Sequence, residues 1–485
     1  MSTFHDKLPN PVQKVGEPQI VKTPVALVER ILDGYPAEVW GDKDKRWLVP
    51  VSKSGVFELG IYVRLMNGLV DSIPNTHDRR EWIVRQMVWS FAPTAACELF
   101  VRRNYLGKVW NDMRGYDKLV GNVFHRDFLK ARVKLNGEVM VKKEADGKET
   151  YVKFDCIVGN PPYQDNSKAN DPKNIYPDFV FKSIDCKPKY MSMVIPARWM
   201  MGSGKGIQSF LNMMIGSKSL SNIVVERDSS KWFPDVSIKG GAMYFIYNSS
   251  HNSHMTSIND VSMNLEGEDC ILTDAISLSV KSKVLAKSDK TFDKVMLGGC
   301  PFGIVSTHKE WSDNIDGCYV CHNSGKGDSA KTCLISKALV KRNIELIDKY
   351  KVCTSKGHGS GSDGISKPFV IDPNHVVSES YLVMAYSDSK KECDNAAEFL
   401  STHFAQYLIS LLKNTQNVAK RVFKYLPYLD FTRSYTDEDL YIMFDLTLEE
   451  IAHIEATTKD FHIFRAKKNG VKKEVKAKFK EMAAK

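Results

Sequence analysis

The residues best suited to chemistry in this sequence are Asn160, Pro161, Pro162 and Tyr163, which follow a mostly apolar run, 154–158, and a single glycine. Two consecutive prolines fix the backbone and remove two N–H donors, so the loop is stiff and its carbonyl groups are free. Asn160 offers an amide oxygen as a hydrogen-bond acceptor, and Tyr163 offers a flat aromatic ring. The loop therefore combines two acceptors with a stacking surface.

These groups suit the activation of a planar exocyclic amine. The side-chain oxygen of Asn160 and the carbonyl oxygen of Pro161 would each accept one N–H of the amine. A pyramidal nitrogen is then favoured, with its lone pair aimed at an electrophilic methyl group. Tyr163 would stack on the ring that carries the amine. If that ring is adenine in a duplex, the base must be flipped out. The simpler alternative is a rigid turn after a strand.

The surrounding sequence predicts the elements that position this loop. Between residues 20 and 250, short apolar runs alternate with helical patterns, which indicates an α/β fold with a doubly wound, mostly parallel sheet. Apolar residues at every fourth position predict a helix over 57–69. Ligands bind at the carboxyl ends of strands in such sheets, where Asn160 is expected. Strands are predicted at residues 47–49, 154–158, 191–195, 222–225 and 242–247.

The chain is expected to contain a short arm, two domains and a tail. Residues 1–20 read as an N-terminal arm, and residues 21–250 form the predicted α/β domain. Residues 248–260 are polar and rich in serine and asparagine, which is typical of a linker. A second domain of the α+β class is expected over 261–460, followed by a basic tail over 461–485.

Three helices are predicted near the end of the second domain. Residues 393–413 form one strongly amphipathic pattern. Capping-type residues at 436–438 and at 447–450 each open another short helix.

The composition is that of a globular protein with a basic surplus. Hydrophobic residues make up 43% and aromatic residues 10% of the 485 residues, which excludes extensive disorder. No apolar run reaches the roughly 18 residues that cross a bilayer, and the polar N-terminus is unlike a signal peptide. We therefore expect a cytoplasmic protein with reduced cysteines. The net charge of +10 favours a polyanionic partner, and residues 465–485 contribute nine Lys/Arg against two Glu.

The segment FDCIVGNPPYQ around Asn160 resembles the gamma-type N6-adenine DNA methyltransferases of restriction–modification systems. Upstream, VKTPVALVERILD, WLVPVSKSGVFELGIYVRLMNGL and GNVFHRDFL resemble the cofactor motifs of that family. Downstream, KYMSMVIPARWMMGSGKG and WFPDVSIKGGAMYFIY resemble its later strands and loops. The similarity covers roughly residues 20–457.

This resemblance implies a Rossmann-like methyltransferase domain that binds S-adenosyl-L-methionine, and a C-terminal domain that recognises a sequence in double-stranded DNA. It implies that Asn160, Pro161, Pro162 and Tyr163 act on a flipped adenine. No metal ligand is expected, and any restriction or defence-system partner would be a separate chain. The cofactor-binding residues that the resemblance implies are Lys22, Thr23, Pro24, Pro50, Ser54, Gly55, Asp127 and Asn160.

The cofactor loop departs from the family's pattern. The loop normally begins with an acid, and Val49 stands in its place. No acid follows the second predicted strand to take the ribose hydroxyls, because Glu98 is one turn too far along. Glu58 is charged where an apolar residue is usual. These departures predict weakened cofactor binding.

Two other functions stay open. A relative that has lost catalysis would act as a DNA-binding or defence or counter-defence interaction protein. The missing acids favour this alternative, and the intact loop at 160–163 disfavours it. Glutamine methyltransferases that act on proteins also carry this four-residue motif, but they lack a second domain of this size.

Weaker signals lie in the second domain. Cys318, Cys321, His322 and Cys333 have a metal-like spacing, yet the second cysteine pair of a zinc ribbon is missing, so a reduced structural pair is favoured. The glycine-rich residues 357–364 favour a mobile loop that faces DNA over the alternative of a phosphate-binding loop. Nearby basic residues form either a solvated face or phosphate contacts. They are Lys337, Lys341, Arg342, Lys351, Lys356, Lys413, Lys420 and Arg421, with Gln416 as a candidate adenine reader.

Overall fold

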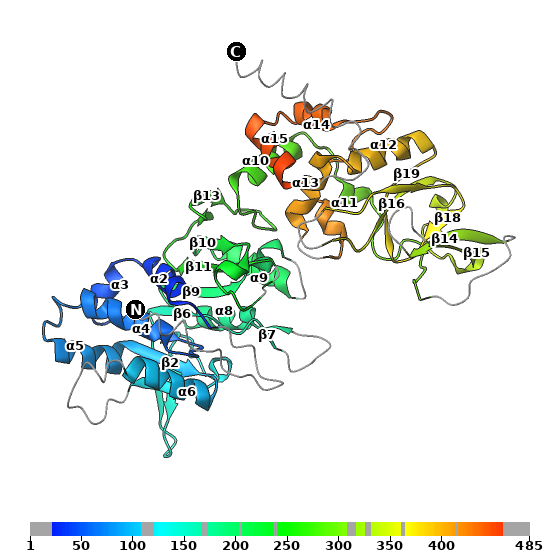
Figure 1. The fold of residues 1–485 in the computed structure, drawn as a ribbon. Helices are drawn as coiled ribbons and strands as arrows, with labels where there is room; N and C mark the ends of the chain where they lie inside the picture. Colours follow the sequence, from blue (N-terminus) through cyan, green and yellow to red (C-terminus); the bar gives the residue numbers. More distant parts are fainter. Residues whose placement is uncertain are drawn as a thin grey trace, which may run out of the picture. The chain divides into compact units, whose positions relative to one another are not determined.

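The computed structural model describes residues 22–107, 121–165, 173–202, 206–236, 238, 240–307, 317–324, 331–359, 364–413 and 416–458 (Figure 1). The chain divides into two compact units, Met1–Thr273 and Asp274–Lys485. The predicted arm and the predicted basic tail lie outside the described residues. In the part of the chain that the structure describes, no helix has the length and apolar character needed to cross a membrane.

The first unit is built on a nine-stranded sheet within the described residues (Figure 1). In spatial order its strands are β13 (Val261–Asn264), β12 (Met255–Ile258), β10 (Leu220–Glu226), β11 (Ala242–Asn248), β9 (Tyr190–Pro196), β6 (Cys156–Gly159), β1 (Trp47–Val49), β2 (Val88–Ala92) and β3 (Asn122–His125). β3, β2, β1, β6 and β9 are parallel neighbours, and β11 runs antiparallel between β9 and β10. The predicted doubly wound, mostly parallel α/β sheet is confirmed.

The chain changes direction across the sheet between β1 and β6. It passes from β1 outward to β2 and β3, and then returns to β6 on the other side of β1. Parallel pairing places Trp47 opposite Cys156, so both strands end at the same edge. Loops that follow strands at such a switch point diverge and leave a crevice. The loops after Val49 and Gly159 therefore lie next to each other.

Helices α2 and α3 each pack against α4 beside this sheet. Ile61 and Leu65 of α4 share a hydrophobic core with Val28 of α2 and with Trp47 and Val49 of β1. The helix predicted over 57–69 is confirmed as α4. Among the described residues, the α-helices of the first unit are α2 (Val25–Asp33), α3 (Glu38–Gly41), α4 (Val56–Gly68), α5 (Thr76–Trp82), α6 (Ala95–Val101), α8 (Tyr176–Asp185) and α9 (Ile207–Gly216). The π-helical turns are η1 (Ile83–Met87) and η2 (Arg102–Leu106), and the 3-10 turns are η3 (Phe128–Lys130), η4 (Ala197–Met201) and η5 (Ser229–Lys231).

Residues 248–260, predicted as a linker, contain β12 and belong to the first unit. β12 pairs in parallel with β10 and antiparallel with β13, so the sheet continues beyond the predicted domain end at 250. Thr256 and Ile258 are buried. Composition could not reveal this strand, because backbone pairing at a sheet edge defines it. Two separate hairpins join β4 (Val139–Lys143) to β5 (Glu149–Val152) and β7 (Gln164–Asp165) to β8 (Lys173–Asn174).

The second unit combines two small sheets with helices, as the α+β prediction expects. One sheet holds β15 (Lys331–Ser336), β14 (Cys318–Ser324) and β18 (His375–Val377), and the other holds β17 (Phe369–Ile371), β16 (Tyr350–Ser355) and β19 (Tyr381–Ser387). Its α-helices among the described residues are α10 (Ala275–Ala286), α11 (Phe292–Val295), α12 (Lys390–Leu400), α13 (His403–Leu412), α14 (Asp437–Met443) and α15 (Leu448–Thr457).

The single helix predicted over 393–413 is wrong, because the segment forms α12 and α13. Thr402 caps α13 by accepting a hydrogen bond from the backbone N–H of Ala405, and Gln406 donates its side-chain amide to the Leu400 carbonyl at 2.6 Å. Apolar periodicity continues through this break, so the pattern did not indicate it. The two later helix starts are confirmed, and each carries a capping box, at Thr436 and at Thr447.

A substitution at Gly68 tests how tightly α4 packs against α3. A Cβ at Gly68 would overlap the carbonyl group of Trp40, whereas a Cβ at Gly216, the last residue of α9, would meet nothing within 4 Å. We expect Gly68→Ala to lower the free energy of unfolding by about 1–3 kcal/mol, because the packed helices must shift. Gly216→Ala should leave it unchanged or raise it by up to about 1 kcal/mol. Urea denaturation measures both, and equal effects would contradict this packing.

Candidate active site

The loop at 160–163 lies against the loop that follows β1. Gly159 ends β6, and a Cβ there would contact the ring of Pro50 at 3.5 Å. All four residues of the loop are buried. The switch point of the sheet thus brings together the predicted catalytic loop and the predicted cofactor loop.

A buried hydrogen bond fixes the orientation of Asn160. Its side-chain Nδ2 donates to Oγ1 of Thr23 at 3.0 Å, and the two residues are only 3% and 4% exposed. The amide oxygen Oδ1 is buried and has no hydrogen-bond partner in the described structure. Since an unpaired buried acceptor is unfavourable, this oxygen is available to a donor from outside the protein.

A pocket opens beside Asn160. It brings together Thr23 before α2, Ser54 and Gly55 before α4, and Asn160 after β6, all four of which were predicted to bind the cofactor. Its walls are Thr23, Val51, Ser52, Lys53, Ser54, Gly55, Val56, Phe57, Glu58 and Asn160.

Four other predicted cofactor residues do not line this pocket. Lys22 and Pro24 flank Thr23 in sequence, and Pro50 faces Gly159. Asp127 is exposed and caps η3 by accepting the backbone N–H of Leu129 at 3.0 Å. The cofactor roles of these four residues stay predictions.

Gly55 allows the predicted cofactor loop to turn into α4. Its φ of 79° lies in the left-handed region that favours glycine, and a Cβ would press on the Val101 carbonyl at 3.3 Å. The loop is held by Asn104, whose side chain donates to the Ser54 carbonyl at 2.9 Å, and by a 2.8 Å bond from the Ser52 N–H to the Phe91 carbonyl. No side chain caps the start of α4. Its first N–H groups therefore remain for a ligand.

Val49, which replaces the family's acid, is 0% exposed and packs in the hydrophobic core of the first unit. It does not line the pocket. An aspartate introduced here would place its carboxylate among apolar side chains, which is unfavourable for an unpaired charge. The core has therefore closed around this position, and Val49→Asp is not expected to restore a cofactor contact.

Sequence reasoning gave no role to Lys53 and flagged Glu58 only as unusual. Both line the pocket, and the Lys53 Nζ and both Glu58 carboxylate oxygens are buried without a hydrogen-bond partner among the described residues. Burial lowers the pKa of Lys53 to about 8 and raises the pKa of Glu58. The sequence did contain a signal for these residues, because two charged residues stand next to the apolar residues that begin α4.

Tyr163 is enclosed in this structure, with 7% of its surface exposed. Burial raises the pKa of its phenol, and the hydroxyl has no hydrogen-bond partner among the described residues. Its predicted stacking on a flipped base therefore requires that the ring become accessible first.

The cysteine and histidine residues singled out in the second unit do not gather around a metal position. Cys321 and Cys333 face each other across β14 and β15, and His322 next to Cys321 contacts His375, with 3.0 Å between Nε2 and Nδ1. Successive residues of a strand point to opposite faces, which separates Cys321 from His322.

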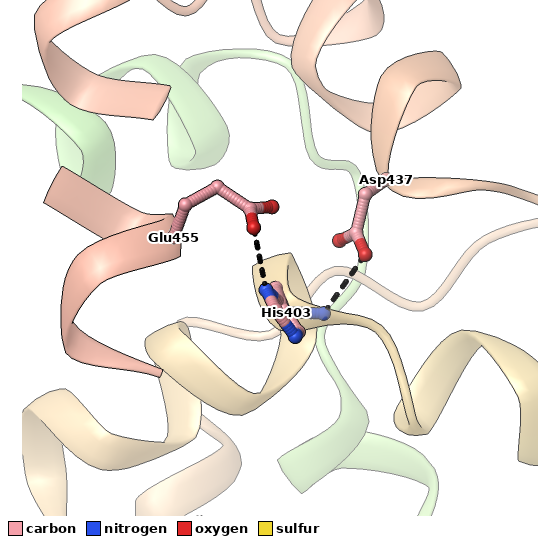
Figure 2. Close-up of side chains that lie close together, drawn as sticks. All are labelled: His403, Asp437 and Glu455. Atoms are coloured by element: carbon pink, nitrogen blue, oxygen red, sulfur yellow. Dashed lines mark hydrogen bonds and ion pairs between the residues drawn. The ribbon is translucent and has the colours of Figure 1, made fainter. Parts of the chain in front are cut away.

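A different group, His403, Asp437 and Glu455, places its ligand atoms within 4.8 Å of one another (Figure 2). The two Asp437 oxygens accept the backbone N–H groups of His403 and Phe404 at 3.1 and 2.8 Å. Glu455 accepts from His403 Nδ1 at 2.9 Å and from the Tyr441 hydroxyl at 2.8 Å. These bonds join α13, α14 and α15, so the group is explained as a structural network.

Two basic residues proposed as DNA contacts are internal. Lys351 is 0% exposed and donates to the carbonyl groups of Leu346 and Ile347, at 3.1 and 2.9 Å. Lys413 is buried and donates to the His358 carbonyl at 2.9 Å. Backbone carbonyls inside the unit hold both ammonium groups, so these two predictions are wrong. Lys337, Lys341, Arg342, Gln416 and Lys420 are exposed.

The pocket carries polar groups that a polar ligand could pair. Asn160 Oδ1, Lys53 Nζ and the Glu58 carboxylate are buried and unpaired in the described structure. Together they offer an acceptor, a cation and an acid to a polar ligand. Unpaired polar groups at one site indicate a missing partner.

Known proteins are similar to this chain in sequence. Residues 95–233 match the family model of the Eco57I restriction-modification methylase. Over 296 residues the chain is 29% identical to an uncharacterised adenine-specific methylase of Mycoplasma pneumoniae (strain ATCC 29342 / M129 / Subtype 1). That alignment covers 50% of this chain and 69% of the relative.

Solved structures of restriction–modification enzymes are also similar. A nuclease-deletion mutant of the type ISP enzyme LlaGI gives a TM-score of 0.48 at 10% identity, covering 82% of this chain and 45% of that one. A modification subunit of a putative type I restriction enzyme from Vibrio vulnificus YJ016 gives 0.32 at 15% identity, covering 52% and 49%. This chain thus spans less than half the length of either protein. The two sequence comparisons confirm the predicted similarity to the N6-adenine methyltransferases of restriction–modification systems.

Proposed function

We propose that this chain transfers the methyl group of S-adenosylmethionine to the N6 amine of an adenine in DNA. The observation that carries the proposal is the Asn160 side-chain oxygen, which is buried and unpaired in the described structure beside a pocket at the carboxyl end of β6. An exocyclic amine supplies the donor that this oxygen lacks. The sequence similarity to an adenine-specific methylase supports adenine as its source.

In this mechanism the protein orients the amine and needs no strong base. Asn160 Oδ1 and the Pro161 carbonyl accept the two N–H groups, which turns the nitrogen lone pair toward the methyl group. Thr23 keeps the amide in this orientation by accepting from Nδ2. When bound, the cofactor supplies an electrophilic methyl group. The nitrogen loses its proton only after the transfer.

Thr23, Ser54, Gly55 and Asn160 would hold the cofactor, because all four line the pocket. Pro162 keeps the catalytic loop stiff. Tyr163 would stack on the flipped base. Because its ring is enclosed in this structure, base entry must displace its neighbours. Flipping is required because the amine of a paired adenine is inaccessible.

We further propose that the second unit recognises the DNA sequence in the cytoplasm, and that any restriction activity resides on a separate chain. Its exposed basic residues would contact phosphates, which fix the register of the protein on DNA.

A second candidate function is a DNA-binding relative without catalysis. The burial of Val49 in the core favours it, because the acid usual in the family is absent and its position is closed. The two functions differ in whether adenine is methylated, so each of the first two experiments below separates them.

The first prediction concerns the unpaired acceptor. Asn160→Ala should lower methyl incorporation into DNA at least about 100-fold, since it removes an acceptor used at the transition state. DNA binding, measured by gel shift, should survive. Asn212→Ala, an exposed asparagine on α9, is the matched control and should keep full activity. Unchanged turnover in Asn160→Ala would remove this loop from the mechanism.

The second prediction concerns the residue that orients Asn160. Thr23→Val keeps the shape of the side chain but removes the acceptor of the Nδ2 bond. We expect a loss of about 1–3 kcal/mol in the free energy of unfolding, because a buried amide donor is left unpaired. Methylation should fall as well, while Thr23→Ser should retain both. Equal behaviour of the valine and serine variants would show that the hydroxyl does not position Asn160.

The third prediction concerns the basic tail. Deleting residues 465–485 removes nine Lys/Arg and two Glu. DNA binding should weaken about equally for all sequences, and its salt dependence should become shallower, because fewer counterions are released. Fluorescence anisotropy at several salt concentrations measures both. A changed sequence preference with the same salt slope would instead make the tail a specificity element.

A further inference from the structure

Lys53 and Glu58 place opposite charges in one pocket without pairing them to the protein. The Lys53 Nζ and both Glu58 carboxylate oxygens are buried, and among the described residues none has a hydrogen-bond partner. Both side chains line the pocket together with Ser54 and Asn160. A buried, unpaired charge is strongly unfavourable. A ligand group of opposite charge would therefore stabilise the charged form of each of these two residues.

The burial of the Lys53 ammonium group is unusual for a lysine. Its side chain is partly exposed, yet its ammonium nitrogen is buried. Lysines normally bury their apolar stem and hold the ammonium in water. Here the ammonium is buried near Cys97 of α6, and the side chain lines the pocket.

Glu58 lies in the first turn of α4 and is 1% exposed. Burial raises the pKa of Glu58, whereas Ser52, Ser90 and the backbone N–H of Glu58 itself lower it in part. Neither serine hydroxyl reaches hydrogen-bond geometry with the carboxylate. Glu58 is therefore surrounded by polar groups that leave its oxygens unpaired.

We propose that Lys53 and Glu58 together receive the α-amino-acid end of the methyl donor. This end is a zwitterion, so the Lys53 ammonium binds its carboxylate and the Glu58 carboxylate binds its ammonium group. The inference rests on the proposed function, since it takes S-adenosylmethionine as the donor. Lys53 and Glu58 would thus provide the contact to the α-amino-acid end that Val49 cannot make. The two charges occupy the cofactor loop and the first turn of the helix that follows.

Calorimetric titration of the full chain with two nucleosides tests this assignment. S-adenosylhomocysteine carries the α-amino-acid group, and 5′-methylthioadenosine lacks it. We expect the wild type to prefer the former at least about tenfold, and Lys53→Met and Glu58→Gln each to reduce that affinity at least about tenfold. Binding of 5′-methylthioadenosine should stay unchanged, which also shows that the variants are folded. Lys43→Met, an exposed lysine outside the pocket, is the matched control.

Proton uptake gives a second readout that a purely structural role would not produce. Burial lowers the pKa of Lys53 to about 8, so the empty pocket loses this proton as the pH rises through that value. A bound carboxylate raises the pKa again. Above about pH 8, S-adenosylhomocysteine should therefore bind more weakly and with uptake of a proton, which is seen as a buffer-dependent heat. Among the described residues, the other titratable groups near this site include Cys97 of α6, Glu58 and Tyr62 of α4, and Tyr105 of η2. Lys53→Met should abolish the uptake, and Cys97→Ala should keep it.

The outcomes separate this inference from the proposed function. Equal affinity of the wild type for both nucleosides would overturn the inference and leave the proposed function standing. The inference would also be overturned if Lys53→Met and Glu58→Gln bound S-adenosylhomocysteine as well as the wild type does. It would equally be overturned if each variant lost affinity for the two nucleosides to the same extent. A wild type that binds neither nucleoside would contradict the proposed function, and the inference would fail with it.

Discussion

The hydrogen bond from Asn160 Nδ2 to Thr23 Oγ1 is the constraint on which the rest of the site depends. It joins residues 137 positions apart in the chain, and both are buried. The bond uses one end of the amide and leaves the other end unpaired beside the pocket. The fold makes this possible, because β1 and β6 end at the same edge and Thr23 immediately precedes Pro24, the N-cap residue of α2. A single buried bond thereby turns a rigid loop into an oriented acceptor.

The same sheet explains why the charged residues of the pocket follow β1 and do not lie on it. β1 is buried at every position, so its end at Val49 belongs to the core and does not reach the pocket. Charged groups instead appear in the following loop, at Lys53, and in the first turn of α4, at Glu58. Their burial costs stability unless a ligand pairs them. The pocket is thus electrostatically incomplete in the protein alone, although its backbone is held firmly by Gly55 and Asn104.

Much of the fold was predictable because buried parallel strands are apolar at every position. The strands around Asn160 and the helix after Gly55 followed from such patterns, and the family resemblance brought Thr23 into the site. The strand β12 was not predictable, because its pairing with β10 defines it. The break between α12 and α13 was hidden by continuous apolar periodicity. These two errors concern elements that tertiary contacts specify.

Lysines gave the least information, because sequence does not show which way an ammonium group points. Lys351 and Lys413 appeared to belong to a DNA-binding face, yet backbone carbonyls hold both inside the second unit. Lys53 was overlooked, although its ammonium is buried and its side chain lines the pocket. In each case the direction depends on groups that lie on other elements or in turns. Only the folded chain places those groups.

The most direct measurement of the account is mass spectrometry of DNA nucleosides after incubation with the full chain and S-adenosylmethionine carrying a deuterated methyl group. Methyl transfer to the exocyclic amine predicts deuterated N6-methyladenine and no methylated cytosine. Folded protein that binds DNA but leaves every adenine unlabelled would contradict the account, and would favour the DNA-binding relative instead.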